Sequence, residues 1–216
     1  MIIEIITVLQ RRISMNYIYV ILLGYLLGCS SMSYYLAKLN GIDIHSKGSK
    51  NLGASNTMML MGWKAGILVG IHDIGKAALA VILSNIIFPT VPYIGAVAGV
   101  ACVWGHIFPF YLKFKGGKGF ASFLGMALAI NWKFTLVLSV VVIIVTLVTD
   151  YIVVGTMTSI ISFPAYMGFA SQSYVLPLII LVASALIVYK HRENLVRIYH
   201  GTEIGFRSAN RGDHRN

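Results

Sequence analysis

The sequence predicts an all-α integral membrane protein with about seven transmembrane helices. Of its 216 residues, 57% are hydrophobic and only 11% are charged, and the mean hydropathy is +0.79. Several apolar stretches approach the length of about 20 residues that a helix needs to cross the hydrocarbon core, where no water satisfies loose backbone groups. These observations favour one membrane domain over a soluble fold.

Apolar segments define the expected helices in order along the chain. The segment at 119–131 is short, so a tilted, re-entrant or buried helix stays open there. If this segment and the next form a re-entrant pair, five membrane spans remain. The N-terminus and the C-terminus then stay on the same sides of the membrane as with seven spans. We expect an N-terminal segment at 1–16, one polytopic domain at 17–206 and a basic tail at 207–216. The segments lie near 17–39, 64–88, 91–110, 119–131, 133–149, 152–170 and 174–190.

Positive charge predicts the orientation, because short loops rich in Lys and Arg stay in the cytoplasm. Of the 17 basic residues, Arg11, Arg12 and Lys133 fall on one side, and Lys76 lies within a span. The N-terminus is therefore expected outside and the C-terminus in the cytoplasm. The basic residues expected on the cytoplasmic side are Lys38, Lys47, Lys50, Lys64, Lys113, Lys115, Lys118, Lys190, Arg192, Arg197, Arg207, Arg211 and Arg215.

The formal net charge of +10 does not indicate nucleic acid, because no soluble fold is left to present a basic face. Anionic lipid and anionic substrates are the expected partners, and neither an obligate protein partner nor a cofactor or metal is expected. Cys29 and Cys102 lie in apolar runs without metal-ligand spacing and are interpreted as small core residues. The stretch LLGCSS at 26–31 imitates a lipid-modified signal sequence, but the small residue expected two places before the cysteine is missing.

The first polar island, GIDIHSKGSKNLGASNT at 41–57, follows the first apolar segment. It is rich in turn and capping residues, and its GASN is expected to start a short helix whose free N–H groups face an anion. A solvated connector is the alternative.

Ionisable residues interrupt the second apolar segment at His72, Asp73 and Lys76. Such residues inside a span are costly and usually face a cavity or each other. Asp73 and Lys76 are three residues apart and are expected to pair on one helix face, either as a structural pair or as part of a site lining.

The second polar island, WGHIFPFYLKFKGGKGFA at 104–121, combines lysines with glycines. Lysines can neutralise a phosphate, glycines let the backbone approach it, and the helix expected from Phe120 adds a positive dipole end. It is not a nucleotide-binding loop, because Lys118 is followed by Gly rather than Ser or Thr and no strand precedes it. A loop that only fixes topology is the alternative.

The third polar island, KHRENLVRIYHGTE at 190–203, ends the last apolar segment. His191 and Asn194 are three residues apart and share a helix face, and Arg197 is another turn-neighbour of Asn194. That face is suited to a polyanion, although a basic helix end resting on lipid headgroups is the competing interpretation. All three islands are expected on the cytoplasmic side, where phosphorylated metabolites are available.

The three islands resemble the motifs of the bacterial acyl-phosphate:glycerol-3-phosphate acyltransferases, the PlsY family, over about residues 24–206. The resemblance is carried by GIDI with GASN, by GHIFPFYLKFKGGKGFA and by HRENLVRIYHGTE. It implies a multi-pass enzyme of the bacterial cytoplasmic membrane that moves an acyl chain from acyl phosphate to the sn-1 hydroxyl of glycerol 3-phosphate. The products are lysophosphatidate and phosphate, the first step of phospholipid synthesis.

The resemblance, together with the residue spacings described above, assigns expected roles to residues. Catalytic roles fall to Lys115, Lys118, His191 and Asn194. A structural role is expected for Glu203, as for Asp73 and Lys76. Substrate-binding roles are expected for Gly116, Gly117, Gly119, Ser30, His45, Ser49, Asn51, Asn56, Thr156 and Arg197.

Some positions depart from the family pattern. Cys29 follows Gly28 where the family has Ser, His45 replaces an Arg, Lys50 replaces the second Gly of GSGN, and Val153 replaces a Ser. A weakened enzyme, a paralogue with another substrate, and an enzyme in which Ser30, Lys47 or Lys50 supplies the missing group all remain open.

Acyl phosphate is an activated mixed anhydride, so positioning and charge stabilisation should matter more than a strong base. The chain lacks the HxxxxD pair of acyl-CoA-dependent enzymes, and no Ser-His-Asp set is evident in the sequence. Direct attack by the substrate hydroxyl without an acyl-enzyme is therefore expected, with the proton passing to a phosphate oxygen or to His191. A non-catalytic paralogue, or a transporter or binding protein for a phosphorylated lipid precursor, is the alternative.

Overall fold

The computed structural model describes residues 2–207, and side chains from Ile13 onward. Within this range the elements are all helical, which confirms the predicted all-α class. Of the predicted basic tail, all but Arg207 lies outside the described residues. The helices are α1 (Ile2–Cys29), α2 (Met32–Leu39), α3 (Ala54–Met61), α4 (Trp63–Ile87), α5 (Ile94–Ile107), the 3-10 turn η1 (Phe110–Leu112), α6 (Phe120–Ile130), α7 (Trp132–Thr149), α8 (Ile152–Ser171) and α9 (Val175–Tyr199).

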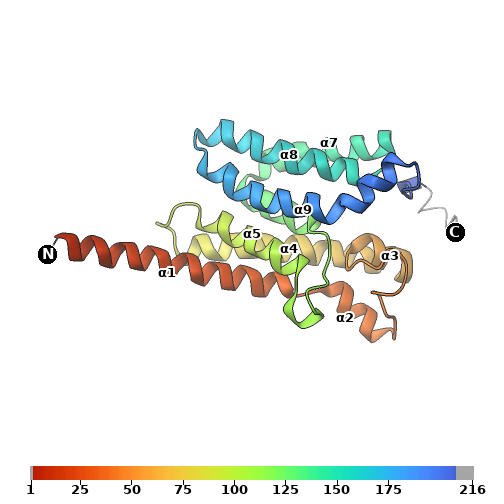
Figure 1. The fold of residues 1–216 in the computed structure, drawn as a ribbon, viewed down its shortest axis with the longest axis horizontal. Helices are drawn as coiled ribbons and strands as arrows, with labels where there is room; N and C mark the ends of the chain where they lie inside the picture. The colour runs from red at the N-terminus through yellow and green to blue at the C-terminus, as the bar shows by residue number, and fades with distance from the viewer. Residues whose placement is uncertain (1, 208–216) are drawn as a thin grey trace.

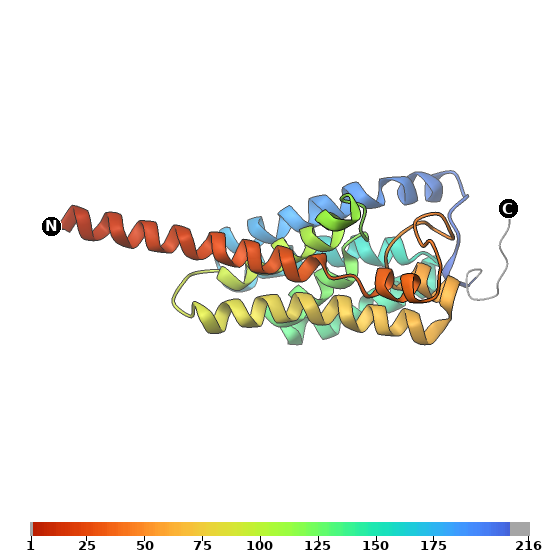
Figure 2. The ribbon, with the colours of Figure 1, turned by 90° about the horizontal axis from the view of Figure 1, so that it is seen from below.

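Six helical segments are long and apolar enough to cross a membrane, and α6 is a shorter apolar helix of 11 residues. The chain is thus a multi-pass membrane protein, and its short fourth segment is helical as predicted. The number of full crossings and the orientation remain predictions. The long helices run roughly side by side, with the first described turns of α1 and the end of α9 at opposite ends of the molecule (Figure 1). The first turns of α1 project beyond the other helices (Figure 2).

Helices α1 and α5 pack with almost no space between their backbones. A Cβ added to Gly28 would lie 2.1 Å from the Cys102 carbonyl oxygen, and one added to Gly105 would lie 2.1 Å from the Tyr25 carbonyl oxygen. Glycine at such contacts lets membrane helices approach closely. This contact brings the end of α1 next to the end of α5.

The predicted segment 17–39 is not one continuous helix, because the chain breaks at Ser30 and Ser31. The Ser31 hydroxyl accepts a hydrogen bond from the Tyr34 N–H at 3.3 Å and starts α2. The break frees backbone carbonyls, which need partners where water is scarce. The Tyr111 hydroxyl donates to the Cys29 carbonyl at 2.8 Å, and the Lys76 ammonium donates to the Ser30 carbonyl at 2.7 Å.

Helix α9 extends beyond the predicted end near residue 190 and includes most of the third island. His191 and Asn194 are both buried on it, as their spacing predicts. Helix α3 begins after Gly53, as expected for the GASN sequence. The first island, which leads into α3, and the end of α9 lie toward the end of the bundle opposite the N-terminal turns of α1, and the loop after α5 lies nearer the middle (Figure 1).

Candidate functional site

The glycine loop, residues 113–119, turns back against the end of α5. The Gly116 N–H donates to the Ile107 carbonyl at 3.0 Å, and the Gly117 N–H donates to the His106 carbonyl at 3.1 Å. A Cβ on Gly117 would lie 2.1 Å from His106 Nε2 and 2.4 Å from the Leu52 carbonyl oxygen. Only glycine fits there, because the loop backbone is pressed between α5 and the first island.

The N–H groups of Gly116 and Gly117 are therefore directed at α5 rather than held for a ligand. The next donors along the chain belong to the start of α6, where Gly119 has φ +92° and accepts the first bond from the Phe123 N–H at 2.8 Å. The N–H groups before Phe123 precede the intrahelical ladder. An anion is best accommodated at this helix start, where the N–H groups and the helix dipole act together.

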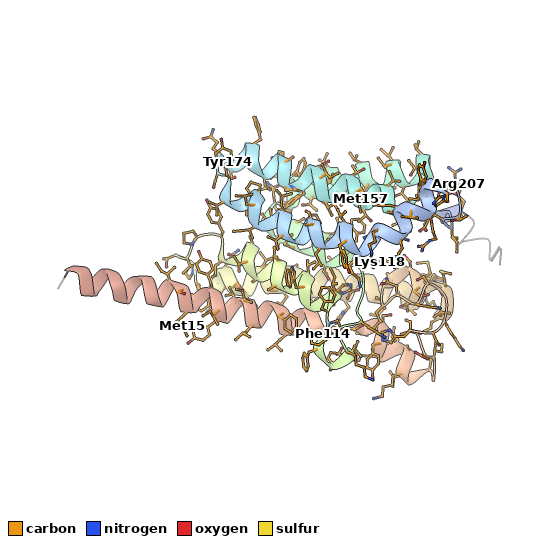
Figure 3. All side chains as sticks on the ribbon, in the orientation of Figure 1. Met15, Phe114, Lys118, Met157, Tyr174 and Arg207 are labelled. Carbon is orange, nitrogen blue, oxygen red and sulfur yellow. The ribbon has the colours of Figure 1, made fainter. Side chains whose placement is uncertain are left out.

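Four polar side chains, which we call the Lys118 chain, join the glycine loop to α9. The Lys118 ammonium donates to Asn194 Oδ1 at 2.6 Å, and Asn194 Nδ2 donates to Glu203 Oε1 at 2.6 Å. The other carboxylate oxygen of Glu203 accepts from Arg197 Nε at 2.6 Å. The second and third motifs thus meet, and Figure 3 shows Lys118 beside α9.

The Lys118 ammonium is partly buried and lies near charges of both signs, the Glu203 carboxylate and the Arg197 guanidinium. Burial lowers its pKa below that of an ordinary lysine, the Glu203 carboxylate acts in the opposite direction, and Arg197 lowers the pKa further. The loss of hydration leaves a cation that gains from pairing with a phosphate.

His191 lies one turn before Asn194 on the same buried face of α9. Its Nδ1 is 2.9 Å from the Ile187 carbonyl oxygen. Because a carbonyl only accepts hydrogen bonds, Nδ1 must carry the proton in a neutral ring, and Nε2 is then an acceptor. The ring is oriented to receive a proton at Nε2.

The first island is organised by Asn56, whose side chain is fully buried. Asn56 Oδ1 accepts from the Ser49 N–H at 2.8 Å, and Asn56 Nδ2 donates to the carbonyls of Lys47 at 3.3 Å and Asn51 at 3.1 Å. The amide is thus committed to the loop backbone. Its predicted part in binding substrate is an indirect one, since it shapes the loop that carries Ser49 and Asn51.

His45 and the exposed Ser49 lie on the same loop, and the His45 N–H donates to Asp43 Oδ1 at 3.1 Å. Lys115 is exposed on the glycine loop. Thr156 is buried in α8, where its hydroxyl donates to the Ile152 carbonyl at 3.0 Å. The described hydrogen bonds do not link His45, Lys115 or Thr156 to the Lys118 chain, so their site roles remain predictions.

The predicted pair of Asp73 and Lys76 is confirmed, with Lys76 Nζ 2.8 Å from Asp73 Oδ1. The structure adds His106, whose Nδ1 lies 3.0 Å from Lys76 Nζ. It also adds a contact at 3.0 Å between the Ser30 hydroxyl and His72 Nε2. His106 was missed by sequence reasoning, although an ionisable residue at the end of an apolar segment was the available signal.

Ser30, His72 and Asp73 form an arrangement of Ser, His and Asp that the sequence did not suggest. His72 Nδ1 lies 3.4 Å from Asp73 Oδ1, at the long limit of a hydrogen bond, whereas the same oxygen is 2.8 Å from Lys76 Nζ. The carboxylate is committed to the lysine. The arrangement therefore serves as a hydrogen-bond network better than as an activated nucleophile.

Comparison with known proteins gives concordant results. The family described as glycerol-3-phosphate acyltransferase matches residues 18–201. The glycerol-3-phosphate acyltransferase 1 of Oceanobacillus iheyensis is 42% identical over 194 residues, which cover 85% of this chain and 92% of that protein.

Two solved structures share the fold. The glycerol 3-phosphate form of PlsY (YgiH), an integral membrane glycerol 3-phosphate acyltransferase, has a TM-score of 0.83 and 32% sequence identity, covering 88% of this chain and 95% of that chain. The lysophosphatidic acid form has a TM-score of 0.80 and 31% identity, covering 88% and 94%.

Proposed function

Because the chain belongs to the glycerol-3-phosphate acyltransferase family, we propose that it transfers an acyl chain from acyl phosphate to the sn-1 hydroxyl of glycerol 3-phosphate. The products are lysophosphatidate and phosphate. Similar structures in glycerol 3-phosphate and lysophosphatidic acid forms support this acceptor and this product. The observation that carries the assignment in this chain is the 2.6 Å contact of Lys118 with Asn194, which joins two motifs 76 residues apart.

The glycerol 3-phosphate site is proposed at the start of α6. Lys118 and the free N–H groups that follow it supply positive charge and donors, while Gly116 and Gly117 hold the loop in place. His191 Nε2 and Asn194 border the same region from α9. A phosphate bound there gains charge-assisted hydrogen bonds, which are worth about 1.5–3 kcal/mol each.

The acyl phosphate site is proposed between the break that follows α1 and the loop at 44–53. Leu52 contacts the glycine loop directly, so a donor held near Ser49 and Asn51 lies next to the acceptor site. The Ser30 hydroxyl and the free groups of the loop, His45 included, are the expected phosphate ligands. The acyl chain extends into lipid.

The proposed reaction is direct attack. The sn-1 oxygen bonds to the acyl carbon, the bond from that carbon to the phosphate oxygen breaks, and the hydroxyl proton passes to a phosphate oxygen or to His191 Nε2. Alignment of the two substrates alone can lower the barrier by about 7–11 kcal/mol. Lys118 and the N–H groups at the start of α6 stabilise the charge that develops on oxygen.

The deciding assay uses purified protein with acyl phosphate and glycerol 3-phosphate. Formation of lysophosphatidate and phosphate in equal amounts is expected, with no product when acyl-CoA replaces acyl phosphate. Incubation with acyl phosphate alone should leave the mass of the protein unchanged. An acylated Ser30 would contradict direct attack, and binding without product would favour the transporter or the non-catalytic paralogue.

We place the active site on the cytoplasmic side of a bacterial cytoplasmic membrane, where anionic lipid would meet the basic loops. Cysteines placed at the exposed residues Ser46 and Lys115 should react with an impermeant thiol reagent from the cytoplasmic side, and one at Lys133 should react from outside. Cys29 and Cys102 are buried, so background labelling should be low. Labelling of 46 and 115 from opposite sides would disprove a single site.

A further inference from the structure

The buried side chains of Asp73, Lys76 and His106, which we call the Lys76 network, have no part in the proposed chemistry. The side chains of Asp73 and Lys76 are 3% and 5% exposed. Replacing a buried ion pair by apolar residues is often neutral or stabilising, so stability is a weak reason for such a pair. Ionisable residues within a membrane span usually mark a functional site.

Lys76 uses all three of its N–H donors on acceptors from three segments. They are the Ser30 carbonyl at 2.7 Å, Asp73 Oδ1 at 2.8 Å and His106 Nδ1 at 3.0 Å. An ammonium has three donors and no acceptor, so its capacity is filled by the protein itself. The Lys76 side chain therefore connects the break after α1, helix α4 and the end of α5.

Two of these connections lead to the proposed substrate sites. The Ser30 carbonyl belongs to the break beside the proposed donor site, and the Ser30 hydroxyl is held by His72 at 3.0 Å. The His106 carbonyl accepts the Gly117 N–H at 3.1 Å. The network therefore links the donor side and the acceptor side through one cation.

The network also determines which nitrogen of His106 carries a proton. His106 Nδ1 lies 3.0 Å from Lys76 Nζ and 3.4 Å from Asp73 Oδ1. Because Lys76 can only donate and its contact is the shorter one, Nδ1 accepts from it, and a neutral ring then carries its proton on Nε2. Nε2 lies against Gly117, in the space that a Cβ would fill. The lysine thus sets the state of the ring that supports the glycine loop.

We propose that Lys76 is a positioning residue that holds the glycine loop and the break at Ser30 in the relative position required for acyl transfer. This inference rests on the proposed function, because it concerns the alignment of the two substrates. A misplacement of about 1 Å can lower turnover about 100-fold. The effect should appear in kcat, since each half-site keeps its own ligands.

The test compares Lys76→Met with Lys76→Arg in the full-length protein. Lys76→Met should lower kcat about 100-fold and leave the KM for each substrate within about threefold of the parent value. Lys76→Arg keeps the charge and donors and should recover part of the lost turnover. Ser84→Ala is the matched control, because it also removes a fully buried polar group from α4. The Ser84 hydroxyl has no hydrogen-bond partner among the described residues, so the kinetics of this variant should not change.

A folded Lys76→Met enzyme with kcat within threefold of the parent would overturn the proposal, as would a change confined to KM. If Lys76→Met does not fold, Asp73→Asn/Lys76→Met removes both charges and is judged by the same criterion. Failure of both variants to fold, with Lys76→Arg fully active, would also overturn it in favour of a structural ion pair.

Hydrogen exchange separates this proposal from the proposed function. Amides of a peptide covering 108–119 should exchange faster in Lys76→Met than in the parent, whether or not the protein is active. A parent that makes no lysophosphatidate would refute the function, while faster exchange would still support the network. Unchanged exchange together with unchanged kcat would refute the network alone.

Discussion

The Lys76 network and the Lys118 chain both join segments that are far apart in the sequence, yet they differ in how their lysines are used. Lys76 is buried and donates to three protein acceptors. Lys118 is only partly buried, and the described contacts give it one protein acceptor, Asn194 Oδ1. An ammonium whose donors are all committed can hold a structure but cannot bind a ligand. An ammonium with spare donors can do both.

The difference assigns separate tasks to the two lysines. A change at Lys118 should reduce affinity for glycerol 3-phosphate as well as turnover, whereas a change at Lys76 should reduce turnover with little effect on affinity. The same changes in KM and kcat for variants of both lysines would contradict this difference in roles.

The largest effect on binding is expected for Lys118→Met. Loss of charge-assisted hydrogen bonds of about 1.5–3 kcal/mol should raise the KM for glycerol 3-phosphate by about tenfold to 100-fold. The KM for acyl phosphate should change much less. Steady-state kinetics with each substrate varied in turn measure both values.

Lys64→Met is the control for charge alone, because Lys64 is an exposed lysine beside the Trp63 ring. Its kinetics should match those of the parent. Equal increases in the KM of both substrates for Lys118→Met would remove the glycine loop from the glycerol 3-phosphate site.

A smaller effect is expected for Glu203→Gln, which weakens the anchor of the Lys118 chain. The carboxylate receives both Asn194 and Arg197 at 2.6 Å, and a neutral amide offers only one accepting oxygen. Loss of about 1.5 kcal/mol predicts a decrease in kcat/KM for glycerol 3-phosphate of about tenfold. Glu193→Gln is the matched control, since Glu193 is 74% exposed and 3.6 Å from Arg192, and a decrease as large in this control would contradict the assignment.

The smallest effect is expected in the pH dependence of binding. Burial lowers the pKa of Lys118, so its charge should be lost at a lower pH than that of an ordinary lysine, whose pKa is about 10.4. The KM for glycerol 3-phosphate should therefore rise with alkaline pH in the parent. In Lys118→Arg the rise should move to higher pH, because arginine stays charged, and identical pH profiles would show that Lys118 is not the titrating group.

Several features of the site followed from local patterns in the chain. The helix start at Phe120 follows from the glycines before it, and the buried face with His191 and Asn194 follows from the spacing of three residues on a helix. The same spacing predicts the ion pair of Asp73 and Lys76. Each of these depends on residues within one or two helical turns, so one sequence is enough to predict them.

Other features depend on how helices pack and could not be predicted in this way. The segment 17–39 has no glycine or proline at Ser30 that would predict a break in the helix. The break is stabilised by hydrogen bonds from α4 and from Tyr111. The inward direction of the Gly116 and Gly117 N–H groups depends on the carbonyls at the end of α5. The hydrogen bond from Asn194 to Glu203 spans nine residues and depends on how the chain turns after α9, so residue spacing does not predict it.

The all-α membrane class, the order of the polar islands and the residue types suited to a phosphate follow from the amino-acid sequence alone, because hydropathy and helical spacing are local properties. The packing of the helices determines that Lys76 has all its donors committed to protein acceptors while Lys118 keeps donors for a ligand. Lys76 reaches Ser30 across 46 residues and His106 across 30, and Lys118 reaches Asn194 across 76. These contacts exist because Gly28 and Gly105 let α1 and α5 pack backbone to backbone and Gly117 lets the loop rest on His106, and such long-range packing leaves no periodic signal in a single chain.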